Sequence, residues 1–180
     1  MCLLQNLEFE IMVTPFNPVL KDGIIYRDQW EVEAREKVIA EARSWLGTPY
    51  HKRAQVKGAG CDCATFIYAV YHTCGLIPDE EIEIFSDDWS MHTSDEVYMR
   101  RIMRHAEITL EGISYPTLKA LPGNIVLTKT DSGRVYDHGG IVTDWPRIIH
   151  AVPNAVEEAN ASQHWLWEFK MVKIFDPWRK

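Results

Sequence analysis

The order of hydrophobic patterns along the chain limits its fold more than any other feature. Before residue 106, three segments carry apolar side chains every three or four residues, as on one face of a helix. After residue 124, short segments rich in β-branched residues alternate with turn sequences such as "DSG" and "DWPR". Helices followed by an antiparallel sheet predict the α+β class. The predicted strands are residues 125–130, 138–143, 148–152 and 165–174.

The predicted helices are marked by residues that cap their first turns. Asp28, Asp62 and Thr93 are the candidate N-caps, because their side chains can accept hydrogen bonds from unpaired backbone N–H groups. Glutamates three residues after Asp28 and after Thr93 complete candidate capping boxes. Residues 1–27 have an extended or hairpin-like pattern with a turn at residues 21–23. The predicted helices are residues 28–47, 62–75 and 94–105.

The length of the chain predicts a single folded domain. At 180 residues it can bury a core without disulfides, and we assign residues 1–30 to an N-terminal extension and 31–180 to the domain. Within this domain, residues from about 79 to 111 form a predicted inserted helical segment. No apolar run is long enough to span a bilayer. No basic region precedes an apolar stretch at the N-terminus, so we expect cytoplasmic synthesis without a signal peptide.

Charge and cysteine content exclude two classes of protein. The formal net charge is −7, and no stripe of lysine or arginine offsets it, so nucleic acid is a poor candidate partner. Four cysteines are too few for a disulfide scaffold, and without an export signal they are expected to be reduced thiols. The cysteines are therefore candidates for packing, metal binding or catalysis.

Cys63 is the cysteine placed for chemistry. It follows the glycine-rich "GAG" loop and comes one residue after the candidate cap Asp62, in the first turn of a helix. The partial positive charge at a helix N-terminus favours a thiolate, so we expect Cys63 to be ionised at neutral pH. The backbone N–H groups of the same turn are candidates for an oxyanion hole.

Two histidines are placed to serve that thiol. His138 begins the predicted strand "HGGIVT", and His150 lies on the next strand, "RIIHAV". If three or five residues separate the paired positions, both rings project from one face of the sheet, whereas four would place them on opposite faces. On one face, His138 is the expected general base and His150 its orienting partner. Asp137 is disfavoured as a partner, because adjacent strand residues face opposite ways.

Four segments, in order, resemble the NlpC family of papain-like cell-wall cysteine peptidases. They are "LGTPYHKRAQVKGAGCDCATFIYAVYHTCGLIP", "LPGNIVL", "DHGGIVT" and "IIHA". The resemblance implies a papain-like fold, hydrolysis of peptidoglycan stem peptides and no cofactor. The bond most often cut in this family joins D-glutamate to diaminopimelate. Among the residues, it implies Cys63 as nucleophile, His138 as base, His150 as third polar residue and Tyr50 as a residue that lines the site.

The sequence departs from the family pattern beside the nucleophile. Ala64 and Thr65 follow Cys63 where Ser-Gly is usual, and Asn124 replaces the usual Asp. The substrate-binding residues we expect are Tyr50, Asp62 and Ala64. The "GAGCDC" variant and the acidic "SDDW" segment are most similar to the phage and prophage branch, which implies phage tail proteins as partners and a location in the virion tail or at the cell wall.

Three other interpretations stay open from the sequence. Cys61, Cys63, His72 and Cys74 are a candidate zinc site, although one residue between the first two cysteines is fewer than usual. A non-catalytic wall-binding or tail-assembly module with the same fold is the second. The third is an amidase or acyltransferase that uses the same nucleophile. Cys61 is expected to be a packing residue, with a redox guard for Cys63 as the alternative.

Overall fold

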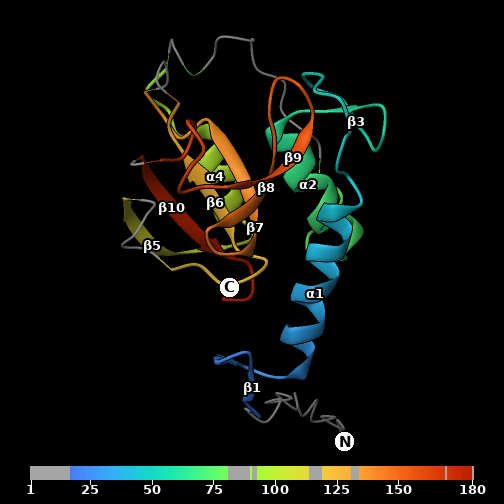
Figure 1. Ribbon diagram of the computed structural model, residues 1–180, viewed down its shortest axis with the longest axis vertical. Coiled ribbons are helices and arrows are strands. Elements are labelled where there is room, and N and C mark those ends of the chain that lie inside the picture. Colours follow the sequence, from blue (N-terminus) through green and yellow to red (C-terminus); the bar gives the residue numbers. More distant parts are fainter. Residues whose placement is uncertain are drawn as a thin grey trace, which may run out of the picture.

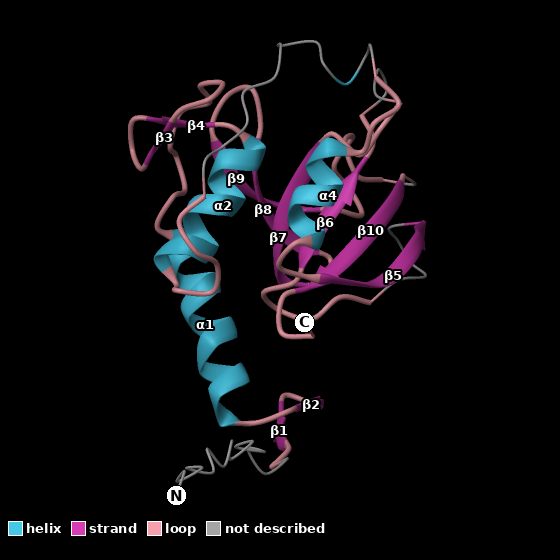
Figure 2. Ribbon diagram, turned by 180° about the vertical axis from the view of Figure 1, so that it is seen from behind, coloured by secondary structure: helices cyan, strands magenta, loops and turns pink. Residues whose placement is uncertain are grey.

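A computed structural model gives the fold for residues 17–80, 90, 93–113, 119–130, 134–168 and 170–179. It is an α+β fold in which N-terminal helices pack on an antiparallel sheet, as the sequence predicts (Figure 1). Helices α1 (Gln29–Arg43) and α2 (Cys63–Thr73) lie side by side, and α4 (Val97–Met103) lies against the sheet (Figure 2). No helix in these ranges has the length and apolarity needed to cross a membrane.

Two of the three helices begin where their caps predict. The Asp28 side chain accepts from the Glu31 N–H at 2.8 Å, and Asp62 caps α2 in the same way. The predicted start of α4 is wrong. Thr93 Oγ1 accepts from the Asp95 N–H, which forms a local turn instead of a helix, and α4 begins only after Glu96.

The main sheet has six antiparallel strands in the order β5-β10-β6-β7-β8-β9. Strands β6 to β9 follow one another as a meander, and β10 returns to pair between β5 and β6. Two small hairpins lie outside this sheet, and the first turns at Asp22-Gly23 as predicted. In chain order the strands are β1 (Val19–Lys21), β2 (Ile24–Tyr26), β3 (Gln55–Val56), β4 (Gly60–Cys61), β5 (Glu107–Ile113), β6 (Ile125–Thr128), β7 (His138–Asp144), β8 (Arg147–Ala151), β9 (Val156–Asn160) and β10 (Met171–Asp176).

Parts of the predicted sheet are wrong. The strand predicted at 165–174 starts only at Met171, because residues 161–168 form turns that the Asn160 side chain begins by accepting from Ser162. Strands β5 and β9 were not predicted, since both lie at sheet edges and alternate weakly. The inserted helical segment is only partly helical: it contains α4 and runs into β5, while residues 81–89 lie outside the described residues.

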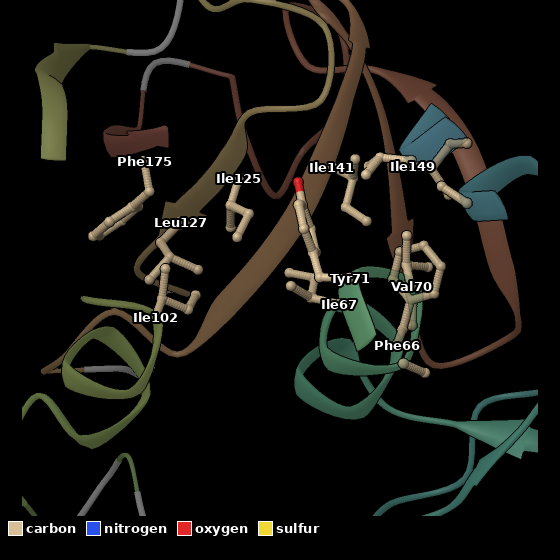
Figure 3. Close-up of a cluster of buried hydrophobic side chains, with 14 of the residues drawn as sticks. Phe66, Ile67, Val70, Tyr71, Ile102, Ile125, Leu127, Ile141, Ile149 and Phe175 are labelled. Atoms are coloured by element: carbon tan, nitrogen blue, oxygen red, sulfur yellow. The ribbon is translucent and has the colours of Figure 1, made fainter. Parts of the chain in front are cut away.

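Each face of the sheet buries an apolar cluster. Ile125, Leu127, Ile141, Ile149 and Phe175 point toward the helices, where they meet side chains of α2 and α4 (Figure 3). Alternate residues of the same strands point to the opposite face, which the 161–168 turns cover. Because α2 is held between α1 and the sheet, its N-terminus has a fixed position beside the start of β7.

Arg35 joins helix α1 to the end of the sheet. Its side chain is only 2% exposed. The guanidinium donates to Glu31 of the same helix, to the Pro122 carbonyl and to Asp176 at the end of β10. It also lies 4.0 Å from the centre of the Trp178 ring. A buried cation with two carboxylate partners thus fixes the position of α1.

Candidate active site

Cys63 and His138 line the same cleft, of about 390 Å³, between the start of α2 and the sheet. Tyr50, which the resemblance implies as a residue of the site, lines the cleft as well, and its contact with substrate stays a prediction. The cleft is therefore formed by segments that are far apart in the sequence. Its other lining residues are Thr130, Asp137, Ala151, Pro153, Trp165 and Leu166.

Cys63 is the first residue of α2, with its side chain at the edge of the cleft. The residue is partly exposed, and its thiol donates a long hydrogen bond to the Asp137 carbonyl at 3.8 Å. The thiol therefore contacts the residue that directly precedes His138. In sites without substrate, catalytic hydrogen bonds are often long and tighten only when substrate binds.

The expectation that Cys63 rests as a thiolate is wrong. Burial, together with the negative charge of Asp62, raises the pKa of the Cys63 thiol to about 12. Backbone N–H groups of Gly139 and Ala64 act in the opposite direction but are outweighed. The thiol is consequently protonated at neutral pH, and the helix dipole alone does not ionise it.

This ionisation state predicts how Cys63 reacts with iodoacetamide. Because only the thiolate is nucleophilic, the alkylation rate is expected to rise about tenfold per pH unit from about pH 6 to pH 10, with no plateau. The same cysteine in urea-unfolded protein should level off near its ordinary pKa of ~8.5. Tandem mass spectrometry at Cys63 gives the rate, and a plateau that begins below neutral pH would indicate a thiolate instead.

His138 and His150 project from the same face of the sheet, as the register argument requires. Gly140 on β7 pairs with His150 on β8, and His138 lies two residues from Gly140. A bulge after Val142 leaves five residues between Val142 and its partner Ile148, which is the odd spacing that places both rings together. His138 Nε2 is 2.9 Å from His150 Nδ1.

Trp167 determines which nitrogens of these rings carry protons. Its indole N–H donates to His150 Nδ1 at 3.2 Å, and an indole nitrogen can only donate. His150 Nδ1 is therefore an acceptor, and the proton of the neutral ring is on Nε2. Because His138 Nε2 faces the same acceptor, it must be the donor, which leaves His138 Nδ1 without a proton.

Burial keeps both rings neutral. It lowers the pKa of His138 to about 4, although the negative charge of Asp137 acts in the opposite direction. It also lowers the pKa of His150, whose side chain is fully buried, and the neighbouring His138 adds to this effect. Near neutral pH, His138 is thus an uncharged imidazole that can accept a proton at Nδ1.

Asp137 does not orient His138, in agreement with the strand geometry. Its carboxylate accepts hydrogen bonds from the backbone N–H and the hydroxyl of Thr130, at 2.8 and 2.7 Å. The side chain thereby joins Asp137 to Thr130, and both residues line the cleft. Its backbone carbonyl is the group that meets the Cys63 thiol.

The structure places Asp62 and Ala64 in supporting positions. The Asp62 carboxylate accepts from the backbone N–H groups of Arg53, Ala64 and Thr65. The Ala64 and Thr65 donors are thus engaged and are not free to form an oxyanion hole. Thr65 Oγ1 accepts in turn from the Asp62 N–H at 2.9 Å, so this departure from the family pattern completes a capping box. Substrate binding by Asp62 and Ala64 stays a prediction.

Neither of the other two described cysteines lines the cleft. Cys61 is fully buried in the core, and burial raises the pKa of its thiol to about 11. Both Cys61 and Cys63 are free thiols. Cys74 caps the far end of α2, about 16 Å of helix from Cys63, so the two cannot share a zinc ion. The redox role of Cys61 stays a prediction.

Sequence reasoning missed the part of the site that residues 161–168 supply. Trp165 and Leu166 line the cleft, and Trp167 bonds to His150. Trp165 is 65% exposed, which is unusual for tryptophan and suits contact with a ligand. The only sequence feature that pointed to this part of the site was the run Trp165-Leu166-Trp167, directly after His164. Its apolar residues were interpreted as the beginning of a strand.

The chain shares its fold with solved NlpC/p60 structures. No protein-family model matches the chain, and no curated protein is similar to it in sequence. NlpC2 from Trichomonas vaginalis matches 79% of this chain and 48% of its own, at a TM-score of 0.53 and 16% identity. An NlpC/p60 family protein from Bacillus cereus matches 84% of this chain and 43% of its own, at 0.51 and 18%. NlpC1 from Trichomonas vaginalis matches 79% and 44%, at 0.50 and 17%.

This chain spans less than half the length of each of these three proteins. The likeness concerns the arrangement of helices and strands, which is the arrangement predicted from the sequence motifs. It does not extend to the segments of those proteins that lie outside the matched region.

Proposed function

We propose that this chain, which has the fold of NlpC/p60 domains, is a cysteine peptidase that hydrolyses amide bonds in peptidoglycan stem peptides. The observation that carries the proposal is the relay from Trp167 through His150 to His138, which leaves an unprotonated imidazole nitrogen beside the cleft that Cys63 lines. A thiol and a neutral imidazole in one cleft are the groups that acyl transfer requires. The sequence motifs supply the substrate class.

In the proposed reaction, His138 acts first as a base and then as an acid. Its Nδ1 takes the proton from Cys63 as the sulfur attacks the carbonyl carbon, and the tetrahedral intermediate forms. Collapse breaks the C–N bond, and the imidazolium returns its proton to the leaving amine. Water, deprotonated by His138, then hydrolyses the thioester and restores the thiol. His150 supports the charged state of His138 through their hydrogen bond.

We propose the bond between D-glutamate and diaminopimelate as the one cleaved, on the strength of the sequence resemblance. Purified muropeptides of known stem composition test this directly. The expected products are a fragment ending in D-glutamate and one with a new diaminopimelate amine, identified by mass spectrometry. Intact muropeptides would favour the non-catalytic module, and cleavage elsewhere in the stem, or transfer of the acyl group to an added amine, would favour the amidase or acyltransferase.

Trp167→Phe is expected to lower kcat by roughly 10-fold to 100-fold with little change in KM, because His150 loses the donor that fixes its tautomer. Loss of a general base typically lowers the rate by about 10²–10⁴-fold, and the expected loss is smaller because His138 itself remains. Trp178→Phe is the matched control: Trp178 is also buried, and its indole nitrogen has no hydrogen-bond partner among the described residues. Equal kcat losses in both variants would show a packing effect only.

We also propose phage tail proteins as partners, with delivery of the enzyme to the cell wall by the virion. The support is the "GAGCDC" sequence together with the acidic "SDDW" segment, which lies outside the described residues. Mass spectrometry of purified virions tests the idea. Presence of the chain in tails would support it, and its presence in the host fraction alone would contradict it.

A further inference from the structure

A second group of potential ligands lies behind the relay, on the side of His150 away from His138. His150 Nε2 is 3.5 Å from Glu157 Oε1, and the same oxygen is 3.2 Å from His164 Nε2. All three ligand atoms lie within 4.8 Å of one another. They come from β8, from β9 and from the turns that follow.

His150 Nε2 is the unusual member of this group. The side chain is fully buried, and Nε2 has no hydrogen-bond partner among the described residues. Leaving a buried polar atom unpaired costs roughly 1–3 kcal/mol. The Glu157 side chain beside it is 46% exposed, so an ion from solvent can reach the group. An unpaired buried nitrogen therefore points at a carboxylate and a second imidazole.

We propose that His150, Glu157 and His164 bind Zn²⁺, and that the bound ion inhibits the peptidase. Two histidines and one glutamate are an established zinc ligand set, and three protein ligands leave a fourth position for water. Bonds of ~2.0–2.1 Å in a tetrahedron separate ligand atoms by roughly 3.3 Å. The distances from the Glu157 oxygen to the two histidine nitrogens, 3.5 and 3.2 Å, match this value, and the two nitrogens lie within 4.8 Å of each other.

Inhibition follows from the position of protons on the two rings and rests on the function proposed above. Zinc at Nε2 of His150 moves the proton of that ring to Nδ1, so the ring stays neutral. Nδ1–H must then donate to His138 Nε2, which moves the proton of His138 to its Nδ1. Each ring keeps one proton, but His138 has no free nitrogen for the Cys63 proton. Zinc binding thus reverses the relay.

The zinc site is tested without any activity measurement. Metal-free Cys63→Ala protein, which lacks the competing thiol, is titrated with Zn²⁺ by calorimetry. One ion per chain is expected, with affinity at least tenfold weaker after Glu157→Gln or His164→Gln. His105→Gln is the matched control, because His105 pairs with Glu80 at 2.7 Å elsewhere in the fold and should not matter. Absence of saturable binding, or equal affinity in all variants, would refute the site.

The reversal of the relay has its own test. In the zinc-bound state, His150 Nδ1–H and the Trp167 N–H are two donors facing each other, which opposes binding. Trp167→Phe removes one donor and should tighten zinc binding severalfold. Unchanged or weaker binding would contradict the proton reversal.

Inhibition is measured as the ratio of muropeptide cleavage rates with and without Zn²⁺ for each protein. For the native sequence, the rate with Zn²⁺ should be at most about one tenth of the rate without it. For Glu157→Gln, the two rates should be nearly equal. Full inhibition in Glu157→Gln would show that zinc acts at the Cys63 thiol, and unchanged rates in zinc-loaded native protein would refute inhibition. If no muropeptide is cut at all, inhibition falls with the proposed function, while the calorimetry still decides the zinc site.

Discussion

Cys63→Ala is expected to reduce muropeptide cleavage by at least about 10⁴-fold, since the sulfur forms the bond to the substrate carbonyl and no other group in the cleft can replace it. Among the described residues that line the cleft, Cys63 is the only cysteine. The substitution removes only the sulfur atom, and Cys63 as a whole residue is partly exposed, so the free energy of unfolding should change by less than about 1 kcal/mol. The loss of activity is therefore chemical and not a consequence of unfolding.

Two further variants make this result specific. Cys74→Ala removes a thiol of similar exposure at the other end of α2, and its activity should stay within a few-fold of the native value. His138→Gln should lose nearly as much activity as Cys63→Ala, because nucleophile and base act as a unit and their losses do not add. Residual cleavage by Cys63→Ala at more than a few per cent would show that another group attacks the substrate.

Arg35→Met is expected to lower the free energy of unfolding by about 3–5 kcal/mol, the usual cost of removing one partner from a buried ion pair. Methionine fills much of the same space, but Glu31 would be left buried without a cation, and Asp176 would keep only the exposed Arg179, at 3.4 Å. The Pro122 carbonyl would also lose its donor. Urea unfolding followed by circular dichroism gives the value.

Arg43→Met provides the matched control on the same helix. Arg43 is 53% exposed and meets Glu158 at 3.3 Å, so its ion pair is screened by solvent. Its loss should cost no more than about 1 kcal/mol. If both variants lost the same stability, helix propensity rather than the buried network would explain the effect, and the account of Arg35 would be wrong.

The parts of this fold that depend on local signals could be predicted from the sequence. Asp28 and Asp62 mark helix starts because a short acidic side chain satisfies backbone donors wherever the chain turns into a helix. The same-face arrangement of His138 and His150 follows from strand periodicity once the spacing between paired residues is odd. The bulge after Val142 produces that spacing, and no local sequence signal specified it.

Other features depend on contacts between distant segments. The ionisation of Cys63 was predicted incorrectly because the helix N-terminus is visible in the sequence, whereas burial of the sulfur and the nearby Asp62 charge are visible only after folding. Trp167 reaches His150 only because residues 161–168 turn back over the sheet. The same turns bring His164 to Glu157. Periodicity cannot reveal such contacts, since Trp167 and His164 belong to no helix or strand.

Nitrogen-15 NMR of histidine-labelled protein at neutral pH tests the relay most directly, because the two ring nitrogens give distinct signals when only one is protonated. His138 and His150 are assigned by comparison with His138→Gln and with His150→Asn. Both rings should be neutral and protonated at Nε2, with Nδ1 of His138 free to accept the Cys63 proton. A proton on Nδ1 of His138, or a charged His138 ring, would contradict the relay and with it the proposed role of this histidine as the base.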